Sequence, residues 1–446
     1  MCNSKMHLKC FAYCKSKTKN FLALLKKDWF RTVFCLSLTF FLPEYLAIGS
    51  VFLSLLFLIR TMKKENLTLK FGRLGILLVL YIITGFISCF YALKPIHSLL
   101  MALLWAAMMI GYFAFTTILT DKSRLRITFK TFMIFAFICG IISIVQYILN
   151  LFGDFLNIRN LWYPLDTYLY KTFSSTSFYT YWSGNRTAST FSNPNLYAME
   201  TLLVLPFGLY CLNTSTNRNG RILHSLLLVI TFVGVLFAFC RSFYFAIVPM
   251  AFAFLILTFA KSRLSRWGLL ILFVSLALFK LIPNPFWERF TDLNFEDSSI
   301  YKRFDAWIVA LRAFRQQPVG GYGFGNLNIF QLLHQYGVDT HHMHNLPFEL
   351  LAEGGLIAIL IFAAMAWNIF VPGVKMHRIK DSHDSILGAT ILVTTAGFLL
   401  FSMAQFPMTT PKSIILFILM YGLFDASADL TNIKKLYPFT KKSSAK

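Results

Sequence analysis

The sequence predicts an all-α, polytopic membrane protein with about 12 transmembrane helices. Hydrophobic residues make up 57% of the 446 residues and charged residues only 14%, whereas soluble domains carry about 25% charged residues. The apolar stretches are continuous and about 20 residues long, as membrane-spanning helices require. Transmembrane barrels instead show alternating segments of about ten residues.

The apolar stretches divide the chain into spans and loops. They lie at 32–43, 44–60, 74–92, 98–119, 127–152, 193–212, 222–240, 243–260, 267–283, 345–371, 385–405 and 412–428. We expect a transmembrane domain over 32–428, with basic cytoplasmic tails at 1–31 and 429–446. The polar interruptions 153–192 and 284–344 are too long for plain connections, so both are candidate functional loops.

The net charge of +23 is explained by the placement of Lys and Arg. In a soluble protein this charge would suggest nucleic acid, but in a membrane protein it sets topology and attracts anionic lipid. With the N-terminus inside and the sides alternating, 30 of the 42 Lys and Arg fall on cytoplasmic segments. This distribution predicts twelve spans with both ends inside, and places loops 153–192 and 284–344 outside.

The eight cysteines do not suggest a disulfide framework. Three lie in the basic N-terminal tail and five lie in or at the ends of apolar stretches, with none in the long polar loops. Cys10 and Cys14 lack a second Cys or His pair, so a zinc site is disfavoured. The first 31 residues show no small-residue cleavage site after an apolar core, so we expect no cleaved signal peptide.

Two arginines stand near predicted outer ends of spans. Arg241 lies between two apolar runs, where a cation opposes the charge bias and either snorkels or has a function. Arg186 lies in a polar segment that leads into the span 193–212 through an Asn-Pro-Asn turn. That turn is either a helix cap, made by Asn195 or Ser192, or part of a site.

The outer segment from Ser299 combines a helical pattern with glycines. Its large apolar residues recur at helical spacing, at Ile300, Phe304, Trp307, Ile308 and Leu311. We expect an amphipathic helix over 300–316, lying on the membrane surface or packed over the bundle, with Arg303 either solvated or in a site. Pro318 ends the helix. Four glycines then form a flexible turn where backbone could approach a ligand closely, at Gly320, Gly321, Gly323 and Gly325.

Three histidines precede the span 345–371, namely His341, His342 and His344. A metal site would need further ligands, so we favour no metal. The alternatives are polar residues capping a helix, which suits His341 and His342, or a general base. A base at neutral pH requires a pKa near 7, and an imidazole beside arginines stays neutral and able to accept a proton.

Outer arginines together with a histidine suit one chemistry. Guanidinium groups bind phosphate bidentately and stay charged near lipid. A nearby histidine can accept a proton from a hydroxyl nucleophile. These parts would move a group from a lipid-linked pyrophosphate to an acceptor hydroxyl outside the cell.

The segments resemble the O-antigen ligase family, which also holds O-antigen polymerases and related bacterial glycan transferases. The resemblance covers residues 180–405. The family pattern of His-Asn, nine residues and Gly is met by His344, Asn345 and Gly355, although Ala358 stands where Gly, Thr or Tyr is usual. The family's arginine at an outer helix end matches Arg241, here in a Cys-Arg-Ser context.

The family's second arginine matches Arg303. It precedes a Trp and a Pro-x-x-Gly-x-Gly turn, which are met by Trp307, Pro318, Gly321 and Gly323 and followed by Asn326. The segment from Arg186 to Asn195 also resembles the family's approach to its sixth helix.

The resemblance implies a metal-independent glycosyltransferase of the bacterial cytoplasmic membrane that needs no cofactor. Its donor would be a glycan on undecaprenyl pyrophosphate, and its cavity would open to the outer leaflet beneath loop 284–344. On this basis His344 is the expected catalytic residue, and Arg186, Arg241 and Arg303 are expected to bind the donor pyrophosphate. Asn345, Gly321, Gly323 and Trp307 are expected to support the site.

Three functions fit the sequence. A ligase would pass the glycan to a lipid A core in lipopolysaccharide synthesis or to another terminal acceptor. A polymerase of O-antigen or capsular polysaccharide would pass it to another lipid-linked repeat unit. A secondary transporter is the alternative from another class, but the spans lack paired broken helices, and Glu200 is the main acidic residue within a span.

Overall fold

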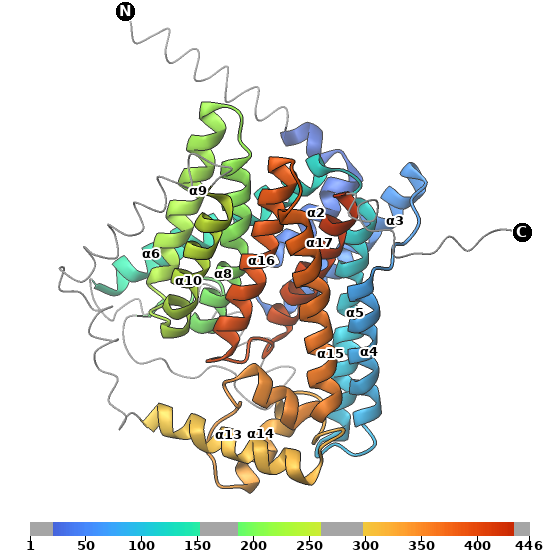
Figure 1. Cartoon of the computed structure of the whole chain (residues 1–446), viewed down its shortest axis with the longest axis vertical. Helices are drawn as coiled ribbons and strands as arrows, with labels where there is room; N and C mark the ends of the chain where they lie inside the picture. The colour runs from blue at the N-terminus through green and yellow to red at the C-terminus, as the bar shows by residue number, and fades with distance from the viewer. Residues whose placement is uncertain (1–20, 152–185, 260–297, 432–446) are drawn as a thin grey trace, which may run out of the picture.

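The computed structural model describes residues 21–151, 186–259 and 298–431 (Figure 1). These residues contain helices and no strand, in agreement with the predicted all-α class. In chain order the helices are α2 (Asp28–Leu38), α3 (Glu44–Glu65), α4 (Arg73–Ser88), α5 (Pro95–Ile118), α6 (Lys122–Leu151), α8 (Pro194–Asn213), α9 (Arg218–Leu236), α10 (Arg241–Thr258), α13 (Ser298–Gln316), α14 (Asn326–Gln335), α15 (Leu346–His377), α16 (Ser382–Ser402) and α17 (Pro411–Leu430).

Nine helices in the described part of the chain are long and apolar enough to cross a membrane. They are α3, α5, α6, α8, α9, α10, α15, α16 and α17. The predicted spans 32–43 and 74–92 correspond to α2, with 11 residues, and α4, with 16. Both are shorter than the roughly 20 residues that a span needs. The predicted span 267–283 lies outside the described residues. The chain is therefore a multi-pass membrane protein with nine candidate spans in that part.

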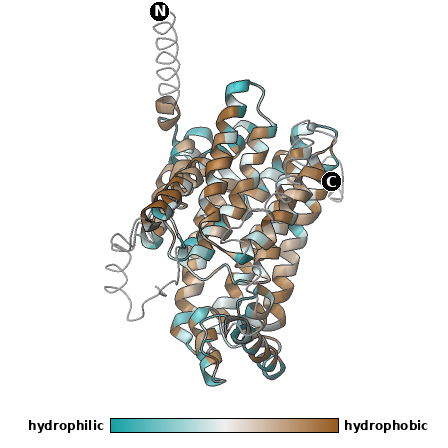
Figure 2. Cartoon of the chain, turned by 90° about the vertical axis from the view of Figure 1, so that its left-hand side faces the viewer, coloured by the Kyte–Doolittle hydropathy of each residue, from teal (hydrophilic) through white to brown (hydrophobic). Residues whose placement is uncertain are grey.

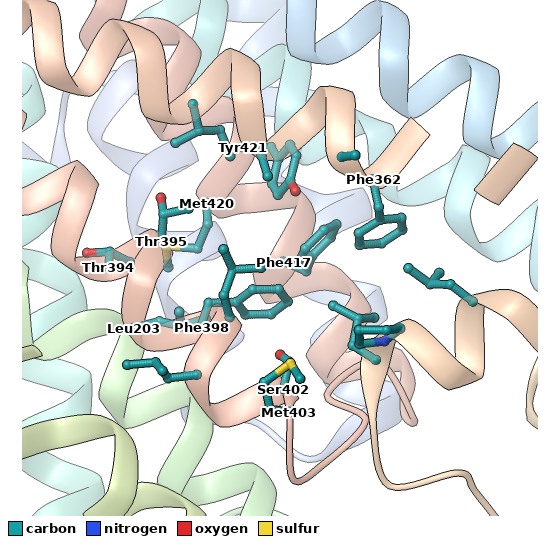
Figure 3. A pocket seen from close by; sticks show the side chains of 18 of the residues that line it. Leu203, Phe362, Thr394, Thr395, Phe398, Ser402, Met403, Phe417, Met420 and Tyr421 are labelled. Atoms are coloured by element: carbon teal, nitrogen blue, oxygen red, sulfur yellow. The ribbon is translucent and has the colours of Figure 1, made fainter. Parts of the chain in front are cut away.

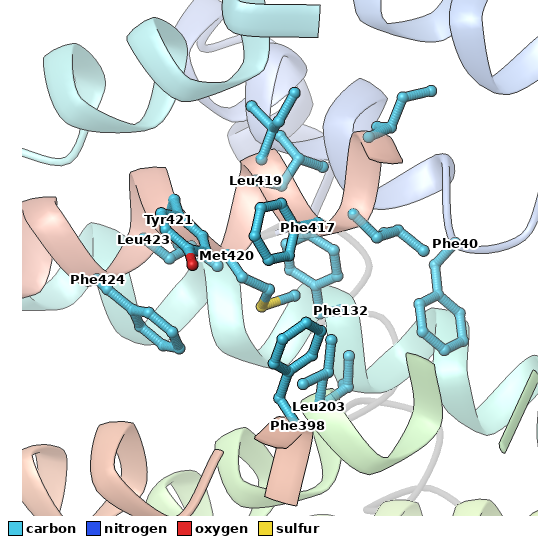
Figure 4. Packing of buried hydrophobic residues seen from close by; sticks show 14 of the residues in the cluster. Phe40, Phe132, Leu203, Phe398, Phe417, Leu419, Met420, Tyr421, Leu423 and Phe424 are labelled. Carbon is cyan, nitrogen blue, oxygen red and sulfur yellow. The ribbon is translucent and has the colours of Figure 1, made fainter. Parts of the chain in front are cut away.

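Helices α8, α16 and α17 form the centre of the bundle. Between 78% and 83% of their span-length windows are buried, against 28% to 50% for the other six candidate spans. Phe398 of α16 and Phe417 of α17 pack against each other in the core, with ring centroids 5.5 Å apart, and Leu203 of α8 belongs to the same cluster (Figure 4). Figure 2 shows apolar residues along the lengths of the helices and polar residues mainly near their ends.

The last three helices alternate in direction. α13 and α14 lie together at one end of the bundle (Figure 1). α15 leaves this end directly after α14, α16 returns to it, and α17 leaves it again. The loop between α16 and α17 is therefore at the same end as α13 and α14, and this end carries the candidate site described below.

We predict that this end faces outward. Alkaline phosphatase fused near Asn294 should be active, because loop 284–344 would be outside, and a fusion near Lys380 should be inactive. Alkaline phosphatase folds only after export, and green fluorescent protein fused at the same two positions supplies the opposite readout. Activity near Lys380 and none near Asn294 would place the candidate site in the cytoplasm and overturn the assignment.

α15 is broken at Gly355. This glycine has φ 58° and ψ −148° inside an otherwise helical segment, a combination that is essentially restricted to glycine. The glycine-rich turn after α13 docks into the break. Tyr322 N donates to Ala352 O at 2.8 Å, Gly323 N to Glu353 O at 3.0 Å, and Leu356 N to Pro318 O at 2.8 Å.

This arrangement corrects two expectations. The span 345–371 is not one continuous helix, and the backbone that the glycines approach is α15 rather than a ligand. A Cβ on Gly321 would lie 2.6 Å from Ala352 O, and one on Gly355 would lie 2.6 Å from Pro318 O. The two glycines therefore allow the turn and the broken helix to meet backbone to backbone.

Substituting Gly355 with alanine should destabilise the protein. The backbone conformation alone should cost about 1–3 kcal/mol, and the Cβ would also collide with Pro318 O. We expect a lower melting temperature in detergent and a lower yield of monodisperse protein. Gly49→Ala in α3 is the matched control, because a Cβ there meets nothing within 4 Å. Equal melting temperatures for the two variants would contradict the assigned role of the break.

α13 contacts the rest of the protein mainly through small residues, while most of the predicted apolar stripe is exposed. Its buried residues are small, namely Ala306, Val309, Ala310 and Ala313. The larger apolar residues Phe304, Ile308 and Leu311 of the predicted stripe are about half exposed, and the side chain of Ile300 is not among those described. Because alanines allow close approach of two helix backbones, α13 packs closely against α15.

Candidate functional site

Three arginines that are far apart in the sequence line one small cavity. Arg186 precedes α8, Arg241 is the first residue of α10, and Arg303 lies on α13. The cavity has a volume of about 90 Å³. Its remaining lining residues are Asn195, Phe239, Cys240, Ser242 and Gln405. The three arginines proposed from the sequence are thus brought together at the end of the bundle that carries α13.

Arg186 is held by neighbours on both sides. Its Nε donates to Ala238 O at 2.9 Å, and its Nη2 donates to Asn195 Oδ1 at 2.6 Å. The helix cap of α8 is made by Asn193, whose side chain accepts from Asn195 N, and not by Asn195 or Ser192 as expected. Ser192 donates instead to Glu44 at 3.1 Å. The Asn-Pro-Asn turn therefore both caps α8 and orients Arg186.

Arg241 stands at the N-terminus of α10, with Cys240 as the N-cap residue. The exposed N–H groups there give a helix N-terminus a partial positive charge, which favours anions and disfavours cations. An arginine at this position adds charge of the same sign as the helix dipole. Three guanidinium groups and a helix N-terminus around one small cavity make an anion-binding site physically reasonable.

His344 lies beside this cavity and shares a residue with it. Its Nδ1 is 3.1 Å from Oε1 of Gln405, which lines the cavity, and its Nε2 is 3.2 Å from Thr340 Oγ1. Burial lowers the pKa of His344 to about 4, with further lowering from the charges of His342 and Arg303. The imidazole is therefore neutral at physiological pH, although its pKa is well below the expected value near 7.

The segment that carries His344 is fixed from three sides. Asn345 caps α15 through Phe348 N and donates from Nδ2 to Met403 O at 2.7 Å. Trp307 donates from Nε1 to Met343 O at 2.8 Å. Glu349 Oε2 accepts from Met343 N at 2.7 Å. These contacts hold His344 at φ 51°, a left-handed conformation that is uncommon outside glycine.

The other two predicted histidines lie elsewhere in the same loop. His341 is exposed and stacks on Phe330, with ring centroids 4.9 Å apart. His342 is 3.4 Å from Glu349 through Nδ1. Within the described ranges, no three His, Cys, Asp or Glu side chains gather in a way that could hold a metal ion.

The predicted supporting residues have structural positions. Trp307 and Asn345 hold the His344 loop, whereas Gly321 and Gly323 lie in the docked turn and do not line the arginine cavity. The sequence reasoning did not single out Gln405. Gln405 is one polar side chain in a short loop between two apolar spans. The only sequence feature that could have pointed to it is the place of this loop between those two spans.

A second, larger cavity begins next to the His344 loop. It is almost entirely apolar, has a volume of about 330 Å³, and lies between α8, α15, α16 and α17. Near the segment that carries His344, the cavity is lined by Leu346, Pro347 and Met403. Farther along α17 it is lined by Tyr421 and Phe424. Figure 3 shows the rings of Phe362, Phe398 and Phe417 around this cavity.

Together these features define a multi-pass membrane protein that places an arginine cluster, a neutral histidine and an apolar cavity at one end of its bundle. Residues 226–363 match the family model described as O-Antigen ligase. Over this segment the chain is therefore similar to the O-antigen ligase family, which confirms the resemblance seen in the sequence. The matched segment includes Arg241, Arg303 and His344. No curated protein sequence matches the chain.

Proposed function

We propose that the protein transfers a glycan from undecaprenyl pyrophosphate to an acceptor hydroxyl at the outer face of the bacterial cytoplasmic membrane. The observation that carries the proposal is the shared cavity of Arg186, Arg241 and Arg303, which Gln405 links to His344. The family match supports glycan transfer in general. The arrangement of these side chains supports the particular donor and mechanism.

The arginines suit a pyrophosphate that becomes the leaving group. Negative charge on the bridging oxygen increases as the bond to the sugar breaks, and preorganised guanidinium groups stabilise that charge. Where the planar donors are held in place before the reaction, little reorganisation is needed at the transition state. Hydrogen bonds to Ala238 and Asn195 hold Arg186 in this way.

His344 suits the proton transfer. The acceptor oxygen would form a bond to the anomeric carbon while the bond from that carbon to the pyrophosphate oxygen breaks. Undecaprenyl pyrophosphate leaves, and the hydroxyl proton passes to His344. A single displacement of this kind inverts the anomeric carbon and requires a base that is neutral before the reaction, as His344 is.

The apolar cavity suits the polyprenyl chain of the donor. It begins at Leu346 and Pro347, directly after His344 and Asn345, and continues between spanning helices. A lipid whose pyrophosphate lies between the arginines would therefore have an apolar path for its chain close to its head group. Burial of hydrocarbon there would add affinity that does not depend on the glycan.

Purified protein in lipid nanodiscs provides the test. Ligation and chain extension differ only in the acceptor, so a labelled undecaprenyl-pyrophosphate glycan is offered with a lipid A core or with a second lipid-linked repeat unit. With EDTA present, we expect label to reach one acceptor and undecaprenyl pyrophosphate to be released in equal amount. Failure with both acceptors by well-folded protein would contradict the proposal.

A further inference from the structure

Gln405 contacts both parts of the candidate site, the arginine cavity and His344. It lies in the loop between α16 and α17, lines the arginine cavity, and accepts a hydrogen bond from His344 at 3.1 Å. It also lies beyond residues 226–363, the segment that matches the family model. The loop is tied to the histidine segment a second time, since Asn345 Nδ2 donates to Met403 O at 2.7 Å.

The chemistry of an amide oxygen determines the state of the histidine. Oε1 of Gln405 carries no hydrogen, so the contact with Nδ1 of His344 requires the proton to be on Nδ1. In the neutral ring Nε2 then holds the lone pair. The hydroxyl of Thr340, 3.2 Å away, can donate to that nitrogen. The same hydroxyl also lies 3.5 Å from His342 O, so its single proton can go to that carbonyl or to the nitrogen that would act as base.

We propose that Gln405 is a positioning residue that fixes the tautomer and orientation of His344, so that Nε2 is the proton acceptor. In this proposal Thr340 Oγ1 occupies the place that the acceptor hydroxyl takes during the reaction. The inference rests on the proposed glycan transfer, because it assigns a role within that reaction. In the transfer step, the hydroxyl proton moves to Nε2 while the acceptor oxygen bonds to the anomeric carbon and the pyrophosphate leaves.

A neutral partner suits the surroundings of His344. The charged and titratable groups that act on it are Arg303 of α13 and, in its own loop, His341 and His342. A carboxylate in place of Gln405 would favour the imidazolium form and hold the proton before the acceptor arrives. An amide orients the ring in the same way without that effect, and its oxygen still accepts from Nδ1–H once His344 is protonated.

Two substitutions of Gln405 separate orientation from charge. Gln405→Leu removes the acceptor for Nδ1–H. We expect kcat to fall at least tenfold, which is part of the roughly 10²–10⁴-fold contribution of a general base, while KM for the donor changes little. Gln405→Glu keeps the shape and adds a charge. Because an opposite charge nearby raises a histidine pKa by about 1–3 units, the acidic limb of the kcat/KM profile should move to higher pH by at least one unit.

Gln335→Glu is the matched control. Gln335 is exposed on α14, so the same change adds the same charge at this end of the protein without contact to His344. We expect its pH profile to superimpose on that of the wild type. All variants are compared as monodisperse protein of equal melting temperature, and Gln405→Glu supplies the readout if Gln405→Leu does not fold.

The outcomes distinguish this inference from the function on which it rests. If the wild type transfers glycan but Gln405→Glu shows the wild-type pH profile, the positioning role is wrong and the proposed function stands. A loss in Gln405→Leu that appears only in KM for the donor would instead make Gln405 part of pyrophosphate binding, and would also overturn the positioning role. If the wild type itself transfers no glycan, the proposed function fails first.

Discussion

Replacing His344 with alanine is expected to lower the rate of glycan transfer by about 10²–10⁴-fold, the usual contribution of a general base. The reason is that His344 is the histidine beside the arginine cavity, to which Gln405 links it. The measurement is transfer of labelled glycan in membranes with equal amounts of variant and wild-type protein. We expect kcat to fall and binding of the donor to persist.

The pH dependence gives a second readout of the same residue. Burial lowers the pKa of His344 from 6.5 to about 4, so the free enzyme keeps its base neutral down to acid pH. The kcat/KM profile reports the free enzyme, and its acidic limb should lie well below pH 6.5. Bound pyrophosphate brings negative charge near Arg303 and His344, so the acidic limb of kcat should lie higher than that of kcat/KM.

Two controls make the His344 result specific. His334→Ala changes an exposed histidine on α14, and His341→Ala changes the exposed neighbour that stacks on Phe330. Both should retain most activity. Near wild-type transfer by His344→Ala would remove this residue from the mechanism. If His341→Ala loses activity and added zinc restores it, a metal site would be favoured over a general base.

Replacing Arg303 with glutamine is expected to lower kcat by about 10²–10³-fold, the usual cost of losing one preorganised donor to a developing anion. Arg241→Gln should have a similar effect, because both residues line the same cavity. Arg303→Lys should restore little of the activity, since lysine cannot supply two parallel hydrogen bonds to a phosphate. The measurement is the transfer rate at saturating donor, together with the dissociation constant of undecaprenyl pyrophosphate.

Arg312→Gln is the control for Arg303, because Arg312 is exposed on the same helix. It should leave both quantities unchanged. If the two arginines act on one pyrophosphate, the double variant Arg241→Gln/Arg303→Gln should lose less than the product of the single losses, since neighbouring groups on one ligand do not act independently. Strictly multiplicative losses would indicate separate sites.

Hydropathy was sufficient to predict most of the helices. Apolar stretches such as 193–212 and 412–428 correspond closely to α8 and α17, because a spanning helix must be apolar along its length. The break at Gly355 could not be predicted in the same way. It lies within a long apolar run, and its conformation depends on hydrogen bonds from a turn that is more than thirty residues away in the sequence.

The packing of α13 shows a second limit. The pattern of Phe304, Ile308 and Leu311 predicted an apolar face, and that face exists, but the alanines opposite are what pack on α15. Small residues are weakly apolar, so periodicity favours the large ones even where close helix packing requires the small ones.

The residues of the candidate site that could be predicted from the sequence are those whose charge is unusual for their predicted position in the membrane. Arg241 lies at a helix end that is predicted to face outward, with neither a basic loop nor an acidic partner beside it in the sequence, so the predicted topology drew attention to it. Gln405 is uncharged and its contact with His344 spans 61 residues, so only the structure reveals it. The pKa of His344 likewise depends on burial, which a sequence motif does not contain.

In the proposed mechanism, Arg186, Arg241 and Arg303 hold the pyrophosphate of a lipid-linked donor beside His344. A cryo-electron microscopy structure with bound undecaprenyl pyrophosphate would show whether they do. We expect phosphate density between the three guanidinium groups and density for the polyprenyl chain in the apolar cavity that begins at Leu346. Pyrophosphate density at another place, with the arginine cavity empty, would contradict the proposed donor site.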